Sequence, residues 1–251
     1  MRIYAIGDVH GHLDKLREVH RQIARDQVDQ GGGGETIVHC GDFVDRGPDA
    51  RGVIDFLIDG QAAGRPFVTL LGNHDLMMLQ FLRSDPGSKR FKDLQFWLRP
   101  KVGGRQTLAS YGVTASPLRL ARRIWADAVA AVPQAHIDFL ERLTAPHVEA
   151  GCFFCHAGVR PGLPLEAQSL DDLIWIREPF LSDLSDHGML IVHGHTPVEE
   201  VTHYGNRLDI DTGAGFGRAL SAVVIEDDAV FRLTSDGRVP VRPVPLGWAM
   251  T

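Results

Sequence analysis

The 251 residues include 44% hydrophobic, 23% charged and 8% aromatic side chains, a composition typical of a globular protein with a substantial apolar core. The net charge of −6 disfavours a dedicated nucleic-acid binder, which usually carries a basic excess. No apolar run approaches the roughly 18 residues that a membrane span needs, and the first residues lack the features of a signal peptide. Three cysteines, an odd number, suit a reducing compartment. We therefore expect a cytoplasmic protein with no membrane or nucleic-acid partner.

The first part of the chain alternates between apolar strands and helices. The pattern predicts strands at 2–7, 36–40 and 67–71, and helices at 13–26, at about 49–63 and from 76 onward. Three strand–loop–helix units in succession indicate a parallel sheet. Four glycines at 31–34 are interpreted as a flexible connector, because no strand leads into them and no helix follows.

The pattern changes between about 84 and 146, where helical stretches dominate near 91–99, 117–131 and 134–144. We interpret this segment as a helical insertion within one domain that spans residues 1–251. Strands resume afterwards, at 152–156, 189–193, 198–203, 207–211, 219–225 and 229–234, and predict a second sheet that is mixed or antiparallel. The proline-rich tail, about 236–251, is expected to be extended on the surface. This order favours an α/β fold with two packed sheets flanked by helices.

Five short segments rich in Asp, His and Asn stand at the ends of predicted strands. They are 7–11 (GDVHG), 41–47 (GDFVDRG), 72–75 (GNHD), 156–158 (HAG) and 193–197 (HGHTP). Ligands of open α/β sheets bind at the carboxyl ends of strands, where loops from different strands meet. Glycines in these segments allow sharp turns and close backbone approach. We therefore expect the segments to form one site.

The residue types in these segments point to metal ions. Six side chains are candidate ligands: Asp8, His10, Asp42, Asn73, His156 and His195. Carboxylates, imidazoles and an amide together suit Mn²⁺, Fe²⁺ or Zn²⁺ better than Ca²⁺. Six ligands exceed the needs of one tetrahedral site and predict two ions that share a bridging carboxylate. Ions about 3.5–4 Å apart clamp the attacking and leaving oxygens of phosphoryl transfer, and Arg46 offers a bidentate phosphate contact.

Taken together, the five segments resemble the motifs of the metallophosphoesterase superfamily, in particular its phosphoprotein phosphatase branch of bacterial and phage type. The match covers about 2–80 and 152–225, and leaves the helical stretch and the tail unmatched. The resemblance implies a calcineurin-like four-layer αββα sandwich and two divalent ions, with manganese expected first and iron or zinc as alternatives. It also implies hydrolysis of a phosphorylated protein or small phosphate ester by a metal-bridging hydroxide.

The resemblance also implies a role for each site residue. It assigns Asp8 and His10 to the first ion, Asp42 to a bridge, and Asn73, His156 and His195 to the second ion. His74 would be no ligand but the general acid that protonates the leaving oxygen, with Asp45 hydrogen-bonded to it. Arg46 and Arg177 would hold the peripheral phosphate oxygens. Arg177 stands in less motif-like surroundings, and a surface ion pair is its alternative.

The motifs leave three candidate functions, two related hydrolases and one non-catalytic scaffold. The first is a serine/threonine protein phosphatase, with phosphotyrosine as a further option. The alternative is a symmetrical diadenosine tetraphosphate hydrolase with the same metal set, in which Ala tends to stand at the position of Asp45. A non-catalytic metal-binding scaffold is the third, and the intact ligands and His74 argue against it. The sequence departs from eukaryotic members at Asp75, where they have Glu. Pro197 replaces the second imidazole of a His-x-His motif, which weakens a nuclease hypothesis.

The remaining His and Cys residues receive structural interpretations. Cys152 and Cys155 are spaced like zinc ligands, but a structural zinc site needs four ligands and no second pair exists. A strand would send these two thiols to opposite faces, so we expect buried thiols, and no covalent role for Cys40. His193 stays unassigned as a packed or solvated imidazole, and His12 is placed at the start of a helix.

Overall fold

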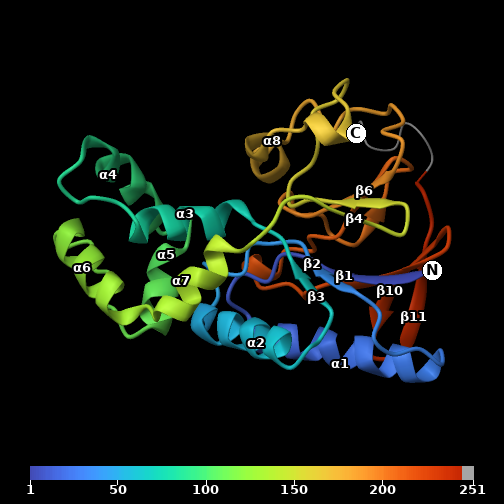
Figure 1. The fold of residues 1–251 in the computed structure, drawn as a ribbon, viewed down its shortest axis with the longest axis horizontal. Coiled ribbons are helices and arrows are strands. Elements are labelled where there is room, and N and C mark those ends of the chain that lie inside the picture. Colours follow the sequence, from blue (N-terminus) through green and yellow to red (C-terminus); the bar gives the residue numbers. More distant parts are fainter. Residues whose placement is uncertain (245–251) are drawn as a thin grey trace.

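The computed structural model describes residues 1–244 and contains two sheets with helices on their outer faces (Figure 1). The six-stranded sheet has the order β11-β10-β9-β1-β2-β3. Its strands are β1 (Arg2–Ile6), β2 (Ile37–His39), β3 (Phe67–Thr69), β9 (Ala222–Glu226), β10 (Ala229–Thr234) and β11 (Gly237–Val241). The five-stranded sheet has the order β4-β5-β6-β8-β7. Its strands are β4 (His147–Glu149), β5 (Cys152–Phe154), β6 (Leu190–His193), β7 (Thr202–His203) and β8 (Arg207–Asp209).

The helices fall into three groups (Figure 1). Helices α1 (Leu13–Asp29) and α2 (Ala50–Ala62) lie along the six-stranded sheet, and α8 (Leu170–Trp175) lies over the other sheet. The third group forms a helical arm at one end: α3 (Asn73–Leu82), α4 (Lys89–Leu94), η1 (Gln95–Leu98), α5 (Gly104–Ser110), α6 (Ala121–Ala131) and α7 (Gln134–Glu141). Short turns of 3₁₀ helix follow at η2 (Leu165–Ala167) and η3 (Ala214–Phe216). No helix of residues 1–244 is long and apolar enough to cross a membrane.

The side-chain alternation of the strands produces four layers. On β1, Tyr4 and Ile6 join the apolar cluster shared with α1 and α2, whereas Ile3 and Ala5 pack between the sheets with residues of β5, β6 and β8. Phe153 of β5 points the other way and packs with α8. Because successive side chains of a strand face opposite sides, each sheet is covered on both faces. The predicted αββα sandwich is therefore confirmed.

The second run of predicted strands is divided between the two sheets, contrary to the prediction of one separate sheet. Strand β9 pairs antiparallel with β1, with Tyr4 opposite Val224, and β10 pairs with β9. Strands β5, β6 and β8 are parallel. All of β9 from Ala222 to Ile225 is buried, as a central strand requires. A local apolar pattern identifies such a strand but carries no information on its neighbour.

The tail differs from the prediction in its first half. Residues Gly237–Val241 form strand β11, which pairs with β10 and places Pro240 opposite Phe231. A proline has no N–H group for the sheet and is therefore found mainly on edge strands, which is the position of β11. The chain is extended there, as predicted, but paired. Residues 245–251 of the predicted tail lie outside the described residues.

Several helix boundaries also differ. The predicted helix at 91–99 is split into α4 and η1, and α6 begins only at Ala121. Helices α5 and α8 have seven and six residues, too few for a helical period to be visible. Helix α3 begins at Asn73, earlier than predicted. The third motif is therefore the first turn of a helix and not a loop.

Candidate metal centre and active site

The five motif segments meet at one place because each follows a strand whose carboxyl end points to the same side. Strands β1, β2 and β3 are parallel neighbours, as are β5 and β6. The segments directly after these five strands carry all six predicted metal ligands, and each ligand is at most 8% exposed. Buried carboxylates at strand ends are costly unless a positive charge pairs with them.

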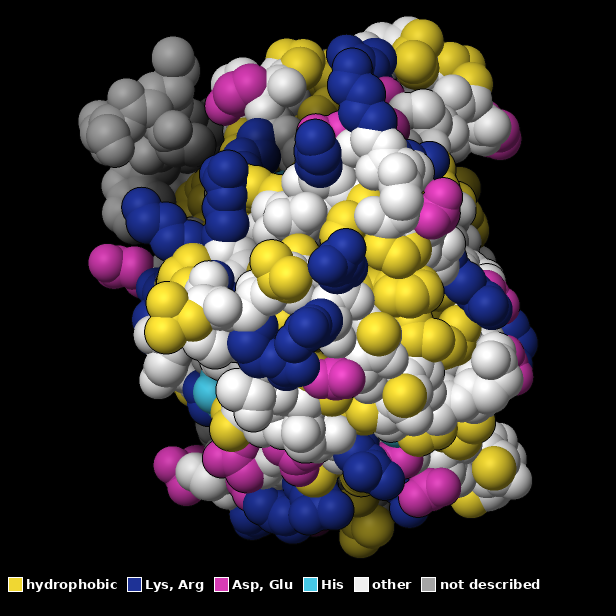
Figure 2. All heavy atoms as spheres, turned by 90° about the vertical axis from the view of Figure 1, so that its left-hand side faces the viewer, with side chains coloured by type: hydrophobic (Ala, Val, Ile, Leu, Met, Phe, Trp, Pro, Cys, Tyr) yellow, Lys and Arg dark blue, Asp and Glu magenta, His cyan; other side chains and the backbone are white. Residues whose placement is uncertain are grey.

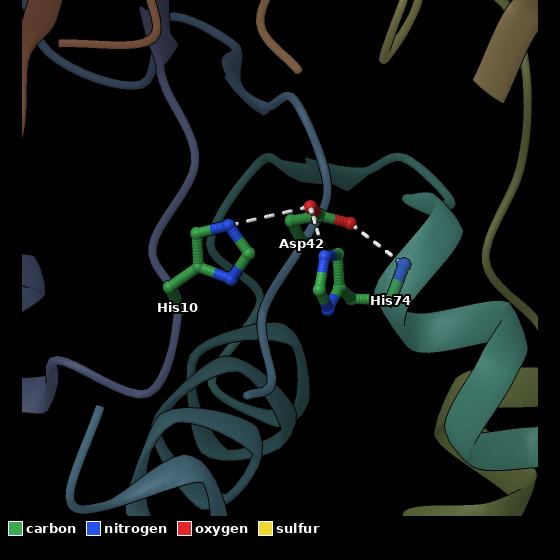
Figure 3. A group of neighbouring side chains, drawn as sticks. All are labelled: His10, Asp42 and His74. Carbon is green, nitrogen blue, oxygen red and sulfur yellow. Dashed lines mark hydrogen bonds and ion pairs between the residues drawn. The ribbon is translucent and has the colours of Figure 1, made fainter. Parts of the chain in front are cut away.

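One group of ligand atoms centres on Asp42 and His10 (Figure 3). The Nε2 atom of His10 lies 3.4 Å from Oδ2 of Asp42. The other ring nitrogen of His10, Nδ1, donates to the carbonyl oxygen of Val44 at 2.9 Å. This hydrogen bond assigns the proton to Nδ1 and leaves Nε2 with a lone pair toward the site. Asp8 adds a carboxylate whose Oδ2 accepts from the backbone N–H of His195 at 3.1 Å.

A second group lies on the other side of Asp42. The Oδ1 atom of Asn73 is 3.0 Å from Nε2 of His156 and 2.9 Å from Nδ1 of His195. Oδ1 of Asp42 is 3.4 Å from the same His156 nitrogen. Because Nδ1 of His156 donates to the carbonyl oxygen of Cys40 at 2.8 Å, its Nε2 also presents a lone pair. The two oxygens of Asp42 thus face different imidazoles, His10 and His156.

These atoms fit divalent cations. Lone pairs of Asn73 and His156 face each other without a proton between them, and Oδ1 of Asp8 is buried with no hydrogen-bond partner among residues 1–244. Burial and the nearby carboxylates of Asp211 and Asp42 raise the pKa of Asp8 well above its usual value. Burial also acts to raise the pKa of Asp42, but the surrounding imidazoles, His156 first, bring it below its usual value. Ligand atoms of Asp8, Asp42 and His156 lie within 4.8 Å of one another, so this cluster is able to hold metal ions.

His74 stands beside this centre in the first turn of α3. Its backbone N–H donates to Oδ1 of Asp42 at 2.9 Å, and Nδ1 of its ring is bonded to Oδ2 of Asp45 at 2.6 Å. Its Nε2 lies 3.9 Å from Oδ2 of Asp42. With His10 and Asp42, it satisfies the distance requirement of a metal triad as well. Geometry alone therefore allows His74 to be a ligand or a proton donor, and the two roles need different tests.

The two predicted phosphate-binding arginines lie in different surroundings. The guanidinium of Arg46 is wedged between the imidazoles, with Nη1 2.6 Å from Nε2 of His10 and Nη2 3.0 Å from Nε2 of His74. It also lies 4.6 Å from the ring centroid of Phe216. In this arrangement the guanidinium places a positive charge at the nitrogen predicted to bind the first metal ion.

Arg177 follows α8 and is exposed. It forms no ion pair with another residue of the described part of the chain. Burial and the neighbouring His156 lower the pKa of His195 to about 2, and the positive charge of Arg177 contributes to this shift. The side chain is therefore close enough to His195 for its charge to act on that imidazole.

The backbone of the site is strained. Five site residues adopt a left-handed conformation that L-amino acids avoid, with positive φ: His10 (46°), Asp42 (52°), Asp45 (73°), Arg46 (66°) and His195 (68°). Such residues cost of the order of 1–3 kcal/mol each and persist only where the surrounding structure enforces them. These residues occur in three of the five motifs, so the placement of the site side chains lowers the free energy of unfolding.

Four further residues of the site were not predicted. Asp75 accepts from the backbone N–H groups of Phe43 and Gly72, at 2.9 and 3.0 Å, and so ties the third motif to the second. Trp97 and Thr107 bond to Asp45, but they stand in the helical insertion, where no motif marks them. Asp211 follows β8 and is near Asp8. It could have been found from the sequence, because it too is a carboxylate placed directly after a strand.

The other His and Cys residues are structural. His193 is fully buried, and burial lowers its pKa to about 3, so it is a packed imidazole and not a solvated one. Cys40, Cys152 and Cys155 are buried free thiols. Cys152 packs between the sheets and Cys155 against α8, on opposite faces of the sheet as predicted.

Comparison with known proteins identifies relatives along most of the chain. A family model for calcineurin-like phosphoesterases matches residues 1–224. The symmetrical bis(5'-nucleosyl)-tetraphosphatase of Aromatoleum aromaticum is 28% identical over 275 positions, covering 93% of this chain and 97% of that protein. Shewanella-like protein phosphatase 2 of Arabidopsis thaliana is 33% identical over 102 residues, 38% of this chain. The match spans only 26% of the Arabidopsis protein's length.

Solved structures show the same fold. One of them, provisionally named a diadenosine tetraphosphatase, has a TM-score of 0.64 and 20% identity, covering 96% of this chain and 94% of its own. A cold-active protein tyrosine phosphatase has a TM-score of 0.63 and 19% identity, with coverages of 96% and 79%. At such identities the likeness concerns the fold alone.

Proposed function

This chain belongs to the calcineurin-like phosphoesterase family, and we propose that it is a metal-dependent phosphomonoesterase that dephosphorylates serine and threonine side chains of proteins. The observation that supports this proposal is the buried 2.6 Å contact between His74 and Asp45, directly beside the candidate metal centre. A proton donor held in this way is needed for a poor leaving group such as a serine alkoxide.

The six ligands would hold two ions. Asp8, His10 and Asp42 take the first, and Asp42, Asn73, His156 and His195 take the second. The chemistry that such ions supply is activation of water and neutralisation of charge on the phosphoryl oxygens. Three imidazole ligands favour Mn²⁺, Fe²⁺ or Zn²⁺ over Mg²⁺. Manganese is our first expectation, tested by adding single metals to chelated protein and measuring the restored rate.

The remaining residues orient the substrate and move one proton. Arg46 and Arg177 hold the peripheral oxygens of the phosphate for in-line displacement, as planar guanidinium groups do well. For this, Arg46 turns from the imidazoles to the phosphate. His74 donates the proton on Nε2 to the departing oxygen, while Asp45 contacts Nδ1 and orients the ring.

A symmetrical diadenosine tetraphosphate hydrolase is the second candidate. The full-length match to the Aromatoleum tetraphosphatase favours it, and so does the basic character of the helical insertion. Residues 84–146 carry ten Lys and Arg against five Asp and Glu, a net charge of +5 in a chain of −6. Against it, a nucleotide leaving group departs as a stable phosphate anion and gains little from the His74 proton.

Rates on two substrates separate the candidates. We expect kcat/KM with Mn²⁺ to be at least about tenfold higher for phosphoserine or phosphothreonine peptides than for diadenosine tetraphosphate, a difference of about 1.4 kcal/mol. Asp45→Ala should lower the peptide rate more than the dinucleotide rate. A tenfold preference for diadenosine tetraphosphate would replace the first candidate with the second.

A further inference from the structure

The carboxylate of Asp45 is held by the helical insertion as well as by His74. Asp45 is completely buried. The indole N–H of Trp97 is 3.0 Å from Oδ1 and 2.9 Å from Oδ2. The hydroxyl of Thr107 donates to Oδ1 at 2.7 Å. The Thr107 hydroxyl thus holds Oδ1, and Oδ2, which Trp97 also contacts, faces Nδ1 of His74 at 2.6 Å.

Thr107 is hydrogen-bonded to the backbone of Asp45 as well as to its side chain. The backbone N–H of Asp45 donates to the Thr107 hydroxyl oxygen at 2.8 Å, so one hydroxyl accepts from the main chain and donates to the carboxylate. Asp45 has a strained φ of 73°, and this double contact opposes relaxation of the turn. A buried carboxylate without such donors would carry a large desolvation penalty.

The insertion is shaped for this contact. A Cβ atom at Gly103 would lie 2.3 Å from the backbone nitrogen of Arg46, and one at Gly104 would lie 2.5 Å from the indole of Trp97. Only glycine allows the chain to approach so closely. Trp97 is in turn packed on Phe81 of α3, the helix that carries His74, with ring centroids 5.0 Å apart.

We infer that Trp97 and Thr107 are positioning residues for the proton transfer by His74. They act through Asp45, whose oxygens they orient so that His74 is aimed at the leaving oxygen. The insertion is then part of the active site and not a separate appendage. This inference rests on the proposed role of His74 as general acid.

The test compares a poor and a good leaving group. Thr107→Val keeps the shape of the side chain and removes the hydroxyl, and Trp97→Phe removes the indole N–H. Each should lower kcat for a phosphoserine peptide about tenfold, a part of the 10²–10⁴-fold that a general acid contributes. The kcat for p-nitrophenyl phosphate, whose leaving group needs little protonation, should fall by less than about threefold. Thr107→Ser should restore most of the peptide rate.

Two controls separate this inference from the proposed function. Trp125→Phe removes another indole N–H of the insertion, one that has no hydrogen-bond partner in the described part of the chain, and should shift both rates equally or not at all. Asp45→Asn should show a peptide-selective loss, and Thr107→Val should add little to it, because coupled residues are not additive. Without a selective loss in Asp45→Asn, the acid role of His74 fails.

Equal losses on both substrates in Thr107→Val and Trp97→Phe, with Asp45→Asn still selective, would overturn the positioning role alone. If Thr107→Val does not fold, Trp97→Phe and the comparison of Thr107→Ser with Thr107→Ala decide in the same way. Thermal unfolding and metal content identify a variant that is damaged as a whole.

Discussion

Asp42 lies between the two groups of candidate metal ligands. Its Oδ2 is 3.4 Å from His10, its Oδ1 is 3.4 Å from His156, and Oδ1 also accepts the backbone N–H of His74. A single carboxylate in this position can bridge two cations, and an amide cannot replace it because it is neutral and offers one oxygen.

Asp42→Asn should therefore lower kcat more than about 10²-fold and reduce the metal content, since even the loss of an outer partner of a ligand typically costs 10–100-fold. Metal analysis of the purified variant and the rate on p-nitrophenyl phosphate measure both effects. Asp59→Asn, an exposed change on α2, is the matched control. Two bound ions and retained activity in Asp42→Asn would contradict the bridging role.

His74 raises a different question, because its ring nitrogen also satisfies the distances of a metal ligand. Its contact with Asp42 under 3 Å is made by the backbone, not by the imidazole. His74→Asn should therefore keep both metal ions and lose roughly 10²–10⁴-fold in rate on alkyl phosphates, with a smaller loss on p-nitrophenyl phosphate. Loss of one metal ion in this variant would show that His74 is a ligand.

At the level of secondary-structure elements, the sequence predicted those features that depend on neighbouring residues in the chain. The motifs after β1, β2 and β3 were identifiable because an apolar strand, a glycine and a ligand-type side chain occur together. The partners of Asp45 were not, since Trp97 and Thr107 stand on short elements whose packing depends on the whole fold. The pairing of β9 with β1 was missed for the same reason. Strand partners separated by more than 200 residues leave no local trace.

The packing of α1 against β2 leads to a prediction on acid stability. His20 of α1 and His39 of β2 are buried with their Nε2 atoms 3.1 Å apart. Burial and the neighbouring His39 lower the pKa of His20 to about 2. Burial lowers the pKa of His39 to about 4. Between pH 6.5 and about pH 4 the unfolded chain binds protons at both sites and the folded chain does not, so stability falls with falling pH.

Each of the two imidazoles should cost about 1.4 kcal/mol of unfolding free energy per pH unit between roughly pH 6 and pH 4. Urea unfolding of chelated protein at several pH values measures the slope without a contribution from metal release. His20→Asn should lower the slope of unfolding free energy against pH by the contribution of one imidazole. The stability of this variant at neutral pH will also change. An identical slope in the variant would show that His20 does not stay neutral in the folded state.

Positive and negative charge are unevenly distributed along the chain. Residues 84–146 have a net charge of +5, whereas the remaining residues carry 16 Lys and Arg against 27 Asp and Glu, a net of −11. The face formed by the helical arm shows many Lys and Arg side chains between apolar ones (Figure 2). The overall charge of −6 therefore conceals a basic region. The insertion touches Asp45 and Arg46 through Trp97, Thr107 and Gly103, and Arg99, Lys101 and Arg105 belong to the same stretch of the chain.

We predict that two exposed cations of the insertion, Arg99 and Lys101, act on an approaching substrate. They stand between Trp97, which bonds to Asp45, and Gly103, which packs on the backbone of Arg46. Charges at the rim of a cleft attract substrates of opposite sign, and salt screens this attraction over about 10 Å at 0.1 M. A phosphopeptide with acidic neighbours should therefore have a lower KM than one with neutral neighbours, and the advantage should shrink as salt is raised.

The double variant Arg99→Gln/Lys101→Gln tests the origin of that advantage. Neither side chain is expected to contact the reacting phosphate, so kcat should stay near its original value while KM for the acidic peptide rises about threefold or more at low salt. The matched control, Arg21→Gln/Arg25→Gln, removes two exposed cations from α1, which lies along the six-stranded sheet and away from the helical arm (Figure 1). If both double variants changed KM equally, the effect would come from net charge. If neither changed it, the basic face of the insertion would have no part in binding. A rise confined to the insertion variant, absent for the neutral peptide and lost in high salt, would show that the insertion selects acidic substrates while Trp97 and Thr107 serve the chemistry.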